Sequence, residues 1–246
     1  MPSFTSKTSV QIPRLEGEDV HVWKLKLSDS LDGLSLAVLS EEEVEKVSRL
    51  RSSKLRARAL SMRVQLRQLL SLYLDLKPID IHFQHAEFGK PSIINSALSF
   101  NVSHSADTAL VAIGLCRELG VDIEQWRELD NLDGLVQRNF SSDEKEQWLS
   151  INDEEKQQTF FNIWTCKEAF IKATGRGLGM GVRRCTFNLQ SPHELRQCPE
   201  QYGEATDWRC VPLEFDGPLS ATLMVGANAC APLIFEFDSD NFPEIA

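Results

Sequence analysis

The segment Phe160–Leu178, which reads FFNIWTCKEAFIKATGRGL, constrains the fold more than any other stretch of the chain. Helical spacing up to about Thr174 gathers one mixed stripe of side chains: Phe160, Phe161, Trp164, Glu168, Ile171 and Lys172. A charge buried without a partner is costly, so Glu168 has to meet a cation, a metal ion or a hydrogen-bond network. The segment therefore predicts either a core helix with an internal Glu168–Lys172 ion pair or a helix that carries an active-site acid.

A second acidic feature is the short predicted strand Gly120–Glu124, which reads GVDIE. Alternation along a strand sends Val121 and Ile123 to one face and Asp122 and Glu124 to the other. The two carboxylates repel each other, and a divalent cation that prefers hard oxygen ligands, such as Mg²⁺, would relieve that repulsion. The strand alone predicts either a magnesium site or a face that points into water.

Charge patterning narrows the class of partner. The chain has a net charge of −10, which disfavours nonspecific binding to nucleic acid or to anionic membranes. One stretch departs from this average, because it contains basic residues and no acidic ones: Arg49, Arg51, Lys54, Arg56, Arg58, Arg63 and Arg67. Such a run is a candidate anion site, and a solvated helix face with snorkelling side chains explains it equally well.

The length of 246 residues suits one large or two modest domains, each with its own core. The beginning of the chain lacks an apolar core of signal-peptide length, and no stretch approaches the ~20 apolar residues of a membrane span. The six cysteines show no metal-finger spacing, so reduced thiols are expected. These observations predict a soluble, cytosolic protein.

Capping signals and periodicity predict the remaining elements. Ser40 with Glu43 forms a capping box at one helix start, and Ser141 is the N-cap of another helix. The helix that ends before Pro78 has a predicted core stripe of Leu55, Ala59, Met62, Leu66, Leu69 and Tyr73. Strands are expected near residues 23–27, 98–103, 109–115, 120–124, 186–189, 207–215, 221–227 and 233–237, and residues 150–158 are expected to be a connection.

Three motifs follow one another in a fixed order. They are Phe100–Ser105 (FNVSHS), Gly120–Glu124 (GVDIE) and Trp164–Ala169 (WTCKEA), the last running into Lys172 and a glycine-rich turn. Together with FGKP at residues 88–91 and the region of Arg58, they resemble the signature of the long, Sfp-type 4′-phosphopantetheinyl transferases. The resemblance covers roughly residues 40–190.

This resemblance implies transfer of the 4′-phosphopantetheine arm of coenzyme A to a serine hydroxyl of an apo acyl or peptidyl carrier protein, with release of adenosine 3′,5′-bisphosphate. It also implies Mg²⁺ as cofactor, a cytoplasmic monomer, and an α+β fold. In that fold, two similar α/β lobes are related by a pseudo-twofold and the active site lies in the cleft between them. Residues 1–116 would form the coenzyme A-binding lobe, and residues 117–246 the lobe that binds metal and carrier protein.

The resemblance assigns roles to individual residues. Three acids match the family's metal ligands: Asp122, Glu124 and Glu168. Lys172 and His104 resemble phosphate-contacting residues, and Ser103 is a further donor to the same phosphates.

The nucleotide contacts match the family less completely. Lys90 and Arg58 correspond to positions near the adenine and the ribose 3′-phosphate, where a bidentate guanidinium is well suited. The family's further basic residues fall on the mostly acidic segment Glu43–Lys46, in which Lys46 is the single cation. The remaining 3′-phosphate contacts are therefore not assigned.

The carrier serine needs a base, and three candidates remain open: Glu168, Glu144 and a metal-bound water. The resemblance places the carrier protein against Gln125–Gln158, where Phe140 and Trp148 are either contact residues or core residues. Two rival functions also remain open from the sequence: a metal-dependent phosphoanhydride hydrolase and a non-catalytic coenzyme A-binding regulator.

Overall fold

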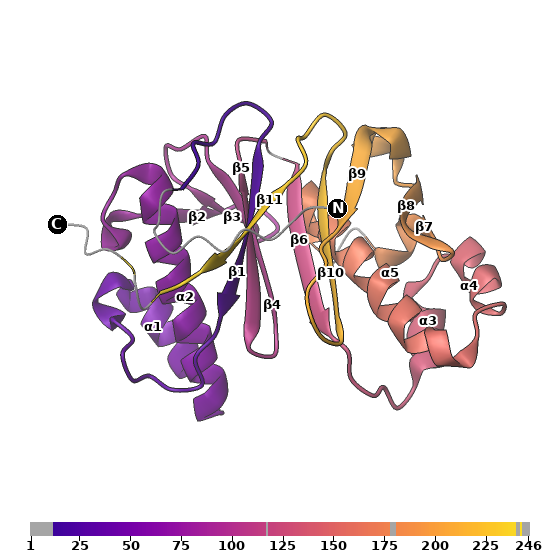
Figure 1. Cartoon of the computed structure of the whole chain (residues 1–246), viewed down its shortest axis with the longest axis horizontal. Coiled ribbons are helices and arrows are strands. Elements are labelled where there is room, and N and C mark those ends of the chain that lie inside the picture. Colours follow the sequence, from indigo (N-terminus) through magenta and orange to yellow (C-terminus); the bar gives the residue numbers. More distant parts are fainter. Residues whose placement is uncertain (1–11, 117, 178–180, 240–241, 243–246) are drawn as a thin grey trace.

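The computed structural model describes residues 12–116, 118–177, 181–239 and 242. The fold is α+β, with two lobes that each contain a small sheet of mainly antiparallel strands and one long helix (Figure 1). The first sheet has the order β11-β1-β5-β4, with β1 (Val20–Lys26), β4 (Ser99–Ser105), β5 (Thr108–Gly114) and β11 (Leu233–Phe237). The second has the order β6-β10-β9, with β6 (Leu119–Gln125), β9 (Trp208–Pro212) and β10 (Leu219–Gly226). The predicted α+β class is confirmed.

The helices and minor strands complete the lobes. The α-helices are α1 (Glu41–Ser48), α2 (Ser53–Leu74), α3 (Leu132–Asn139), α4 (Ser142–Trp148) and α5 (Asp153–Thr174). Two antiparallel pairs are formed by β2 (Phe83–His85) with β3 (Pro91–Ile93), and by β7 (Thr186–Asn188) with β8 (Ser191–Gln197). Short 3₁₀ turns are η1 (Leu36–Val38), η2 (Pro78–Asp80), η4 (Val182–Arg184), η5 (Glu200–Tyr202) and η6 (Ala205–Asp207).

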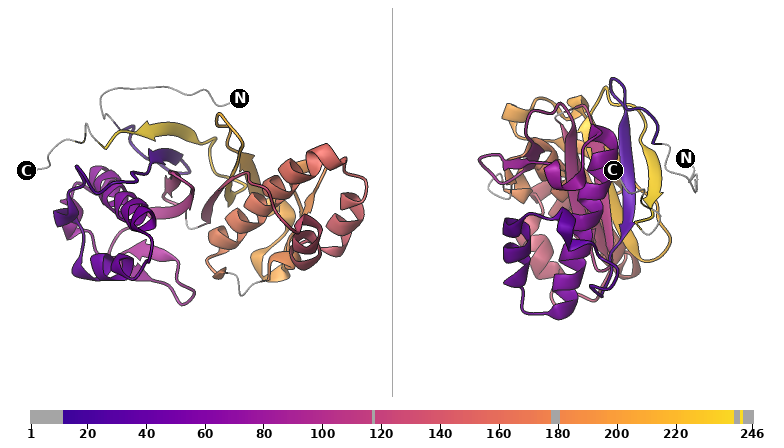
Figure 2. Two further views of the ribbon diagram at one scale, coloured as in Figure 1. Left: turned by 90° about the horizontal axis from the view of Figure 1, so that it is seen from below. Right: turned by 90° about the vertical axis from the view of Figure 1, so that its left-hand side faces the viewer.

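Each lobe has its own apolar core, and a further core between the two sheets joins the lobes. In Figures 1 and 2 the strands occupy the middle of the molecule and the helices cover its two outer sides. Leu69 of α2 packs with Leu25 on the outer side of the first sheet, and Phe170 of α5 belongs to the core of the second lobe. Between the sheets, a third core joins Val22 of β1 to Val121 of β6. Because burial of apolar surface is the main favourable term in folding, this shared core fixes one lobe against the other.

The last described strand returns to the first lobe. β11 pairs in parallel with β1, so that His21 lies opposite Leu233. In Figure 1, β11 crosses from the second lobe to lie beside β1. The lobe boundary near residue 116 stays a prediction, and the backbone pairing of β11 assigns this strand to the first sheet.

Several local predictions are confirmed. Ser40 and Glu43 form the capping box of α1, and Gly175 ends α5 with a φ of 70°. Two predictions are wrong. Leu55 is 54% exposed because the first turn of α2 lies at the surface, where Leu55 lines a cavity instead of the core. Of the stretch expected to be a connection, residues 153–158 form the beginning of α5, whose first turn carries three acids that suit the positive end of a helix dipole.

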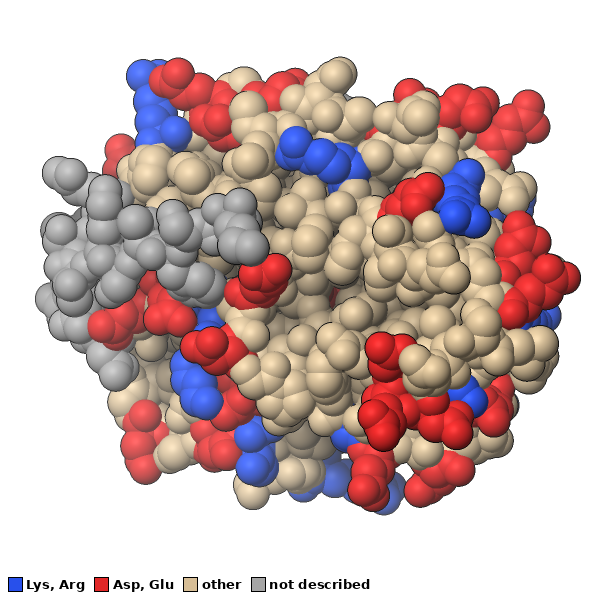
Figure 3. Space-filling view, turned by 45° about the vertical axis from the view of Figure 1, so that its right-hand side comes forward, with Lys and Arg blue, Asp and Glu red and all other residues tan. Residues whose placement is uncertain are grey.

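The surface agrees with the acidic composition. Figure 3 shows acidic side chains spread over much of one face, with several lysines and arginines along its lower edge. Among the described residues, no helix combines the length and the apolar character that crossing a membrane requires. All six cysteines are free thiols.

Candidate active site

The motifs that follow one another along the chain form a spatial cluster where α5 lies on β6. The two elements touch so closely at Gly120 that a Cβ atom there would lie 2.1 Å from the carbonyl oxygen of Ala169 and 2.4 Å from the nitrogen of Ala173. Any side chain at Gly120 would therefore push α5 away from β6. The glycine of one motif thus brings the acids of β6 close to Glu168 on the helix.

The two carboxylate oxygens of Asp122 have different hydrogen-bonding environments. Its Oδ1 accepts hydrogen bonds from Nζ of Lys172 and from Oγ of Ser103, both at 2.7 Å. Its Oδ2 is buried and has no hydrogen-bond partner among the described residues. Burial raises the pKa of Asp122, and the Lys172 ammonium and the Ser103 hydroxyl act in the opposite direction. A buried carboxylate oxygen without a partner is costly, so Oδ2 is the atom of this site that most needs a cation.

The other two acids lie within electrostatic range of Asp122. Burial and the neighbouring charge of Asp122 raise the pKa of Glu168 to about 7, while Lys172 lowers it. Glu124 accepts hydrogen bonds on Oε2 from Ser105 at 2.9 Å and from Arg127 at 3.2 Å. The ion pair of Lys172 is with Asp122, so the alternative of a Glu168–Lys172 pair is not the arrangement in the structure.

The donor set fits a magnesium ion that is completed by its substrate. As they stand in the described part of the chain, no three His, Cys, Asp or Glu side chains converge to enclose a metal ion. Mg²⁺ usually takes one or two protein carboxylates and fills its octahedral shell with water and substrate phosphates. Oδ2 of Asp122, which has no partner among the described residues, and the carboxylate of Glu168, which is repelled by Asp122, supply the hard oxygen ligands that Mg²⁺ prefers.

His104 links this cluster to the first lobe. Together with Lys46, Arg58 and Arg63 it lines a cavity of about 440 Å³, here called the His104 cavity. Desolvation and the nearby cations Lys172 and Arg63 lower the pKa of His104, so its imidazole is neutral and can donate or accept a hydrogen bond. The histidine therefore lies between a cationic cavity and the acidic cluster.

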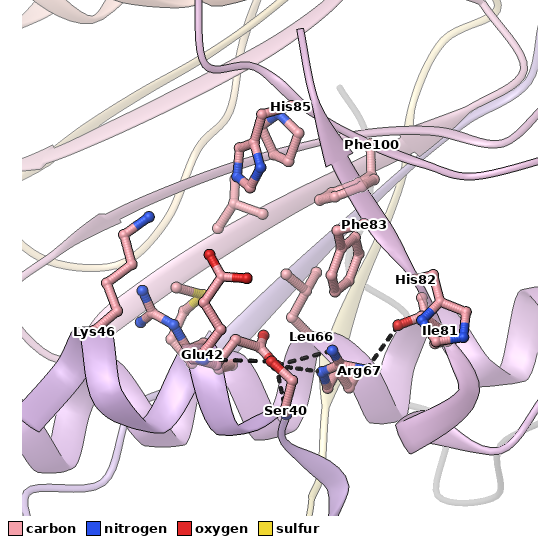
Figure 4. A pocket seen from close by; sticks show the side chains of 15 residues that line it. Ser40, Glu42, Lys46, Leu66, Arg67, Ile81, His82, Phe83, His85 and Phe100 are labelled. Atoms are coloured by element: carbon pink, nitrogen blue, oxygen red, sulfur yellow. Dashed lines mark hydrogen bonds and ion pairs between the residues drawn. The ribbon is translucent and has the colours of Figure 1, made fainter.

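A second cavity of about 350 Å³, the Phe83 cavity, adjoins the first and shares Lys46, Met62 and Arg63 with it. Figure 4 shows Lys46 on one side of this space and Phe83 on another. Phe83 and Phe100 line it with flat apolar surface, and Arg63 contributes charge where the two cavities meet. Such a combination suits a planar base joined to phosphates.

Arg58 and Lys90 reach different surroundings. Arg58 forms an ion pair with Asp29, which also pairs with Lys54 at 3.1 Å, and its side chain is 17% exposed on the His104 cavity. Lys90 donates to the carbonyl oxygens of Leu119 at 2.9 Å and Ala173 at 3.2 Å, and burial lowers its pKa to about 8. Lys90 thus joins the loop of the first lobe to β6 and α5.

The structure does not bring Glu144 to the site. Its carboxylate is fully buried in the second lobe and pairs with Lys167 at 2.8 Å. It also accepts hydrogen bonds from the backbone nitrogens of Ser141 at 2.7 Å and Phe187 at 2.8 Å. With its oxygens occupied in this way, Glu144 is an architectural residue and not a base that a serine could reach, which corrects its assignment as a catalytic candidate.

The two aromatic residues expected to be either carrier contacts or core residues belong to the core. Phe140 and Trp148 are 0% and 4% exposed, with their rings in edge contact at 5.8 Å between centroids.

The sequence did not distinguish Arg63 from the other residues of the basic run. In the structure Arg63 lines both cavities. Arg63 lies five residues after Arg58, about 140° further around α2, so helical spacing alone gives no signal that both side chains reach the same cavity.

Comparisons with known proteins agree with this arrangement. A family model described as the 4′-phosphopantetheinyl transferase superfamily matches residues 118–222, and one described as the N-terminal part of a 4′-phosphopantetheinyl transferase matches residues 26–115. The 4′-phosphopantetheinyl transferase HetI of Nostoc sp. is 37% identical over 170 residues, which cover 67% of this chain and 72% of HetI.

Two other relatives extend the comparison. The 4′-phosphopantetheinyl transferase Sfp of Bacillus subtilis is 32% identical over 161 residues, covering 65% of this chain and 70% of Sfp. The L-aminoadipate-semialdehyde dehydrogenase-phosphopantetheinyl transferase of Mus musculus is 28% identical over 202 residues, covering 76% and 65%. The chain therefore belongs to the Sfp-type 4′-phosphopantetheinyl transferases, enzymes that transfer the 4′-phosphopantetheine arm of coenzyme A to carrier proteins.

Proposed function

We propose that the enzyme binds coenzyme A across the two cavities and the acidic cluster, with Mg²⁺ held by Asp122, Glu124 and Glu168. The observation that carries this proposal is the divided environment of Asp122, whose Oδ1 is held by two donors while Oδ2 is buried without a partner. When bound, Mg²⁺ neutralises negative charge on the pyrophosphate oxygens as the phosphorus centre is attacked.

The nucleotide end of coenzyme A is assigned to the first lobe. Lys46, Arg58 and Arg63 supply positive charge along the His104 cavity, and the Phe83 cavity offers an apolar surface for the adenine. The segment around Lys46 supplies a single cation, and Arg63 adds a second guanidinium beside that of Arg58. Lys90 acts here through its bonds to β6 and α5, since these fix the loop beside the cavity.

The reaction joins a carrier serine to the pantetheine phosphate. The serine Oγ forms a bond to the β-phosphorus of coenzyme A, the bond from that phosphorus to the bridging oxygen breaks, and adenosine 3′,5′-bisphosphate leaves. His104 and Lys172 would hold the pyrophosphate oxygens from opposite lobes, which orients the pyrophosphate for in-line attack.

Glu168 is the proposed acceptor of the serine proton. Without a metal ion, burial and the charge of Asp122 raise the pKa of Glu168 to about 7. With a cation bound, that pKa would be lower, so the carboxylate would be ionised and able to accept the proton. Glu144, the other carboxylate considered, is fully buried and paired with Lys167.

The partner is an apo acyl or peptidyl carrier protein that approaches the second lobe near residues 125–158. In this part of the chain, Leu149 is 85% exposed, whereas the neighbouring Trp148 is buried. We assign the enzyme to the cytoplasm as a monomer, with coenzyme A on the first lobe and the metal and carrier on the second.

One experiment separates this function from its rivals. The protein is incubated with coenzyme A, Mg²⁺ and an apo carrier protein, and the intact mass of the carrier is measured. A gain of one phosphopantetheine group supports the transferase. Release of adenosine bisphosphate without a change in carrier mass would indicate a hydrolase, and binding without turnover would indicate a regulator.

A further inference from the structure

A row of small polar residues on β4 faces the acids of β6. β4 and β6 are edge strands of different sheets, and within the described chain no backbone ladder joins them. Asn101, Ser103 and Ser105 occupy every second position of β4, so their side chains lie on one face of that strand. Each of them makes a hydrogen bond to β6.

These three contacts replace the missing ladder. Oδ1 of Asn101 accepts from the nitrogen of Val121 at 2.9 Å. Oγ of Ser105 accepts from the nitrogen of Gln125 at 3.0 Å and donates to Glu124. Because Asn101 and Ser105 hold backbone atoms at the two ends of the contact, they set the register between the lobes.

The register matches serines to acids. Ser103 and Ser105 are two residues apart on β4, as Asp122 and Glu124 are on β6, and each serine hydroxyl donates to its own acid, at 2.7 Å and 2.9 Å. Ser103 is 7% exposed, and the carboxylate to which its hydroxyl donates is also buried. A slip of one residue would turn both hydroxyls away from both acids.

We propose that Ser103 and Ser105 are positioning residues that hold the carboxylates of Asp122 and Glu124 so that their other oxygens face the bound cation. The proposal rests on the proposed function, since it concerns the same metal site. It gives Ser103 a role different from the phosphate donor that the family resemblance implies, because its hydroxyl proton is committed to Asp122.

The two serines are expected to contribute unequally to the orientation of the acids. Asp122 is 5% exposed, so when the Ser103 hydroxyl is lost, Oδ1 keeps Lys172 as a partner but has little access to water that could replace the missing donor. The side chain of Glu124 is 23% exposed and is also held by Arg127. Removal of the serine hydroxyl should therefore matter more at Ser103 than at Ser105.

This arrangement makes the metal site depend on both lobes. His104 lies between the two serines in sequence and points from the opposite face of β4 to line the His104 cavity. One strand of the first lobe thus contacts the proposed nucleotide site through His104 and orients the acids of the second lobe through the serines.

The test measures metal binding without turnover. Mn²⁺ replaces Mg²⁺, and free Mn²⁺ is followed by electron paramagnetic resonance as it binds to the protein in the presence of coenzyme A and in the absence of carrier. Ser103→Ala should bind Mn²⁺ about 10- to 100-fold more weakly, the range seen when a residue that orients a metal ligand is removed. Ser105→Ala should bind it a few-fold more weakly, and Ser103→Thr, which keeps the hydroxyl, should bind it nearly as well as the wild type.

Ser99→Ala on the same strand is the matched control and should bind Mn²⁺ like the wild type. Equal affinity of wild type and Ser103→Ala would overturn the proposal, as would a Ser103→Thr variant as weak as Ser103→Ala. If Ser103→Ala does not fold, as judged by its thermal midpoint, Ser105→Ala decides in the same way.

The Mn²⁺ measurement and the carrier-mass experiment can reject the positioning role and the proposed function independently of each other. A wild type that modifies no carrier but loses Mn²⁺ affinity in Ser103→Ala would reject the function and keep the positioning role. A wild type that modifies the carrier, with equal Mn²⁺ affinities across the serine variants, would keep the function and reject the positioning role. A wild type that binds no Mn²⁺ with coenzyme A present would reject the positioning role as well.

Discussion

Two of the three lysines of helix α5 lie five residues apart, and each of these two forms an ion pair with an acid from another element. In the closed pair, Lys167 and Glu144 are both 0% exposed and lie 2.8 Å apart. Lys167 also donates to the carbonyl oxygens of Val182 and Cys185, so the closed pair is surrounded by backbone partners.

In the open pair, Lys172 and Asp122 lie 2.7 Å apart, and their side chains are 26% and 7% exposed. Here Oδ2 of Asp122 has no partner among the described residues, and Glu168 adds a second charge of the same sign nearby. Burial of an ion pair therefore does not by itself identify a functional site. An ion pair whose polar atoms all have hydrogen-bond partners has a structural role. A pair in which one buried polar atom has no partner can still bind a ligand.

The same chemical change in each pair should therefore have opposite consequences. Asp122→Asn keeps the shape of the side chain and removes its charge, so it should lower kcat/KM by about 10³-fold or more, because metal stabilisation of developing charge contributes several kcal/mol. The free energy of unfolding in EDTA should stay within about 1 kcal/mol of the wild type or rise, since a buried charge is relieved. Transfer assays at saturating Mg²⁺ and urea unfolding check both statements. Near wild-type turnover would remove Asp122 from the metal site.

Glu144→Gln should instead reduce stability and spare the chemistry. It leaves Lys167 charged and buried without its counter-ion, a situation that costs about 3–5 kcal/mol. The free energy of unfolding from urea titration should fall by about that amount, while kcat of the folded fraction at low temperature stays close to that of the wild type. An unchanged stability together with a large loss of kcat would return Glu144 to the list of candidate bases.

The sequence identified Asp122 and Lys172, the members of the open pair, as site residues, but it did not predict that they pair with each other. The acids of GVDIE and the stripe of α5 follow from strand and helix periodicity, which are local rules, and both appear in the structure as expected. Ser141 was predicted as an N-cap, and in the structure it forms a capping box with Glu144. What no local rule supplies is Lys167, whose position against Glu144 depends on how α4 packs on α5.

The seam between β4 and β6 escaped prediction for the same reason. Ser103 and Asp122 are 19 residues apart and belong to different sheets, so only the packing of the two lobes brings them together. Leu55 fits the helical stripe as well as Leu69 does, yet it lies in the first turn of α2 and is exposed. Periodicity identifies a face, whereas exposure depends on where the neighbouring element ends.

The open pair should also make the metal-free enzyme sensitive to pH. The pKa of Glu168 in the folded protein, about 7, lies above its ordinary value of 4.5, so the folded state holds more protons than the unfolded chain between these values. Stability should therefore fall as pH rises from about 4.5 to about 7, by about 1–2 kcal/mol after allowance for solvent screening.

Urea unfolding in EDTA at pH 5 and pH 8 tests this expectation, with Glu168→Gln as the control that cannot titrate. The wild type should lose more stability than the variant between the two pH values, and Mg²⁺ at pH 8 should restore part of the loss because it binds the folded state. An equal loss in both proteins would show that the raised pKa of Glu168 has no energetic consequence.

The smallest effect is expected outside both pairs, where Arg58 and Lys54 share Asp29 as their partner. Arg58 is 17% exposed and lines the His104 cavity, whereas Lys54 is 57% exposed and does not line it. Arg58→Ala should therefore raise KM for coenzyme A by about tenfold or less, which corresponds to about 1.4 kcal/mol, with little change in kcat. Lys54→Ala should change KM less, because a solvated ammonium contributes little to binding. The KM for coenzyme A lacking the 3′-phosphate separates the causes: a contact to that phosphate predicts a smaller effect of Arg58→Ala on the analogue, and an equal effect on both substrates would mean that Arg58 acts only through its ion pair with Asp29.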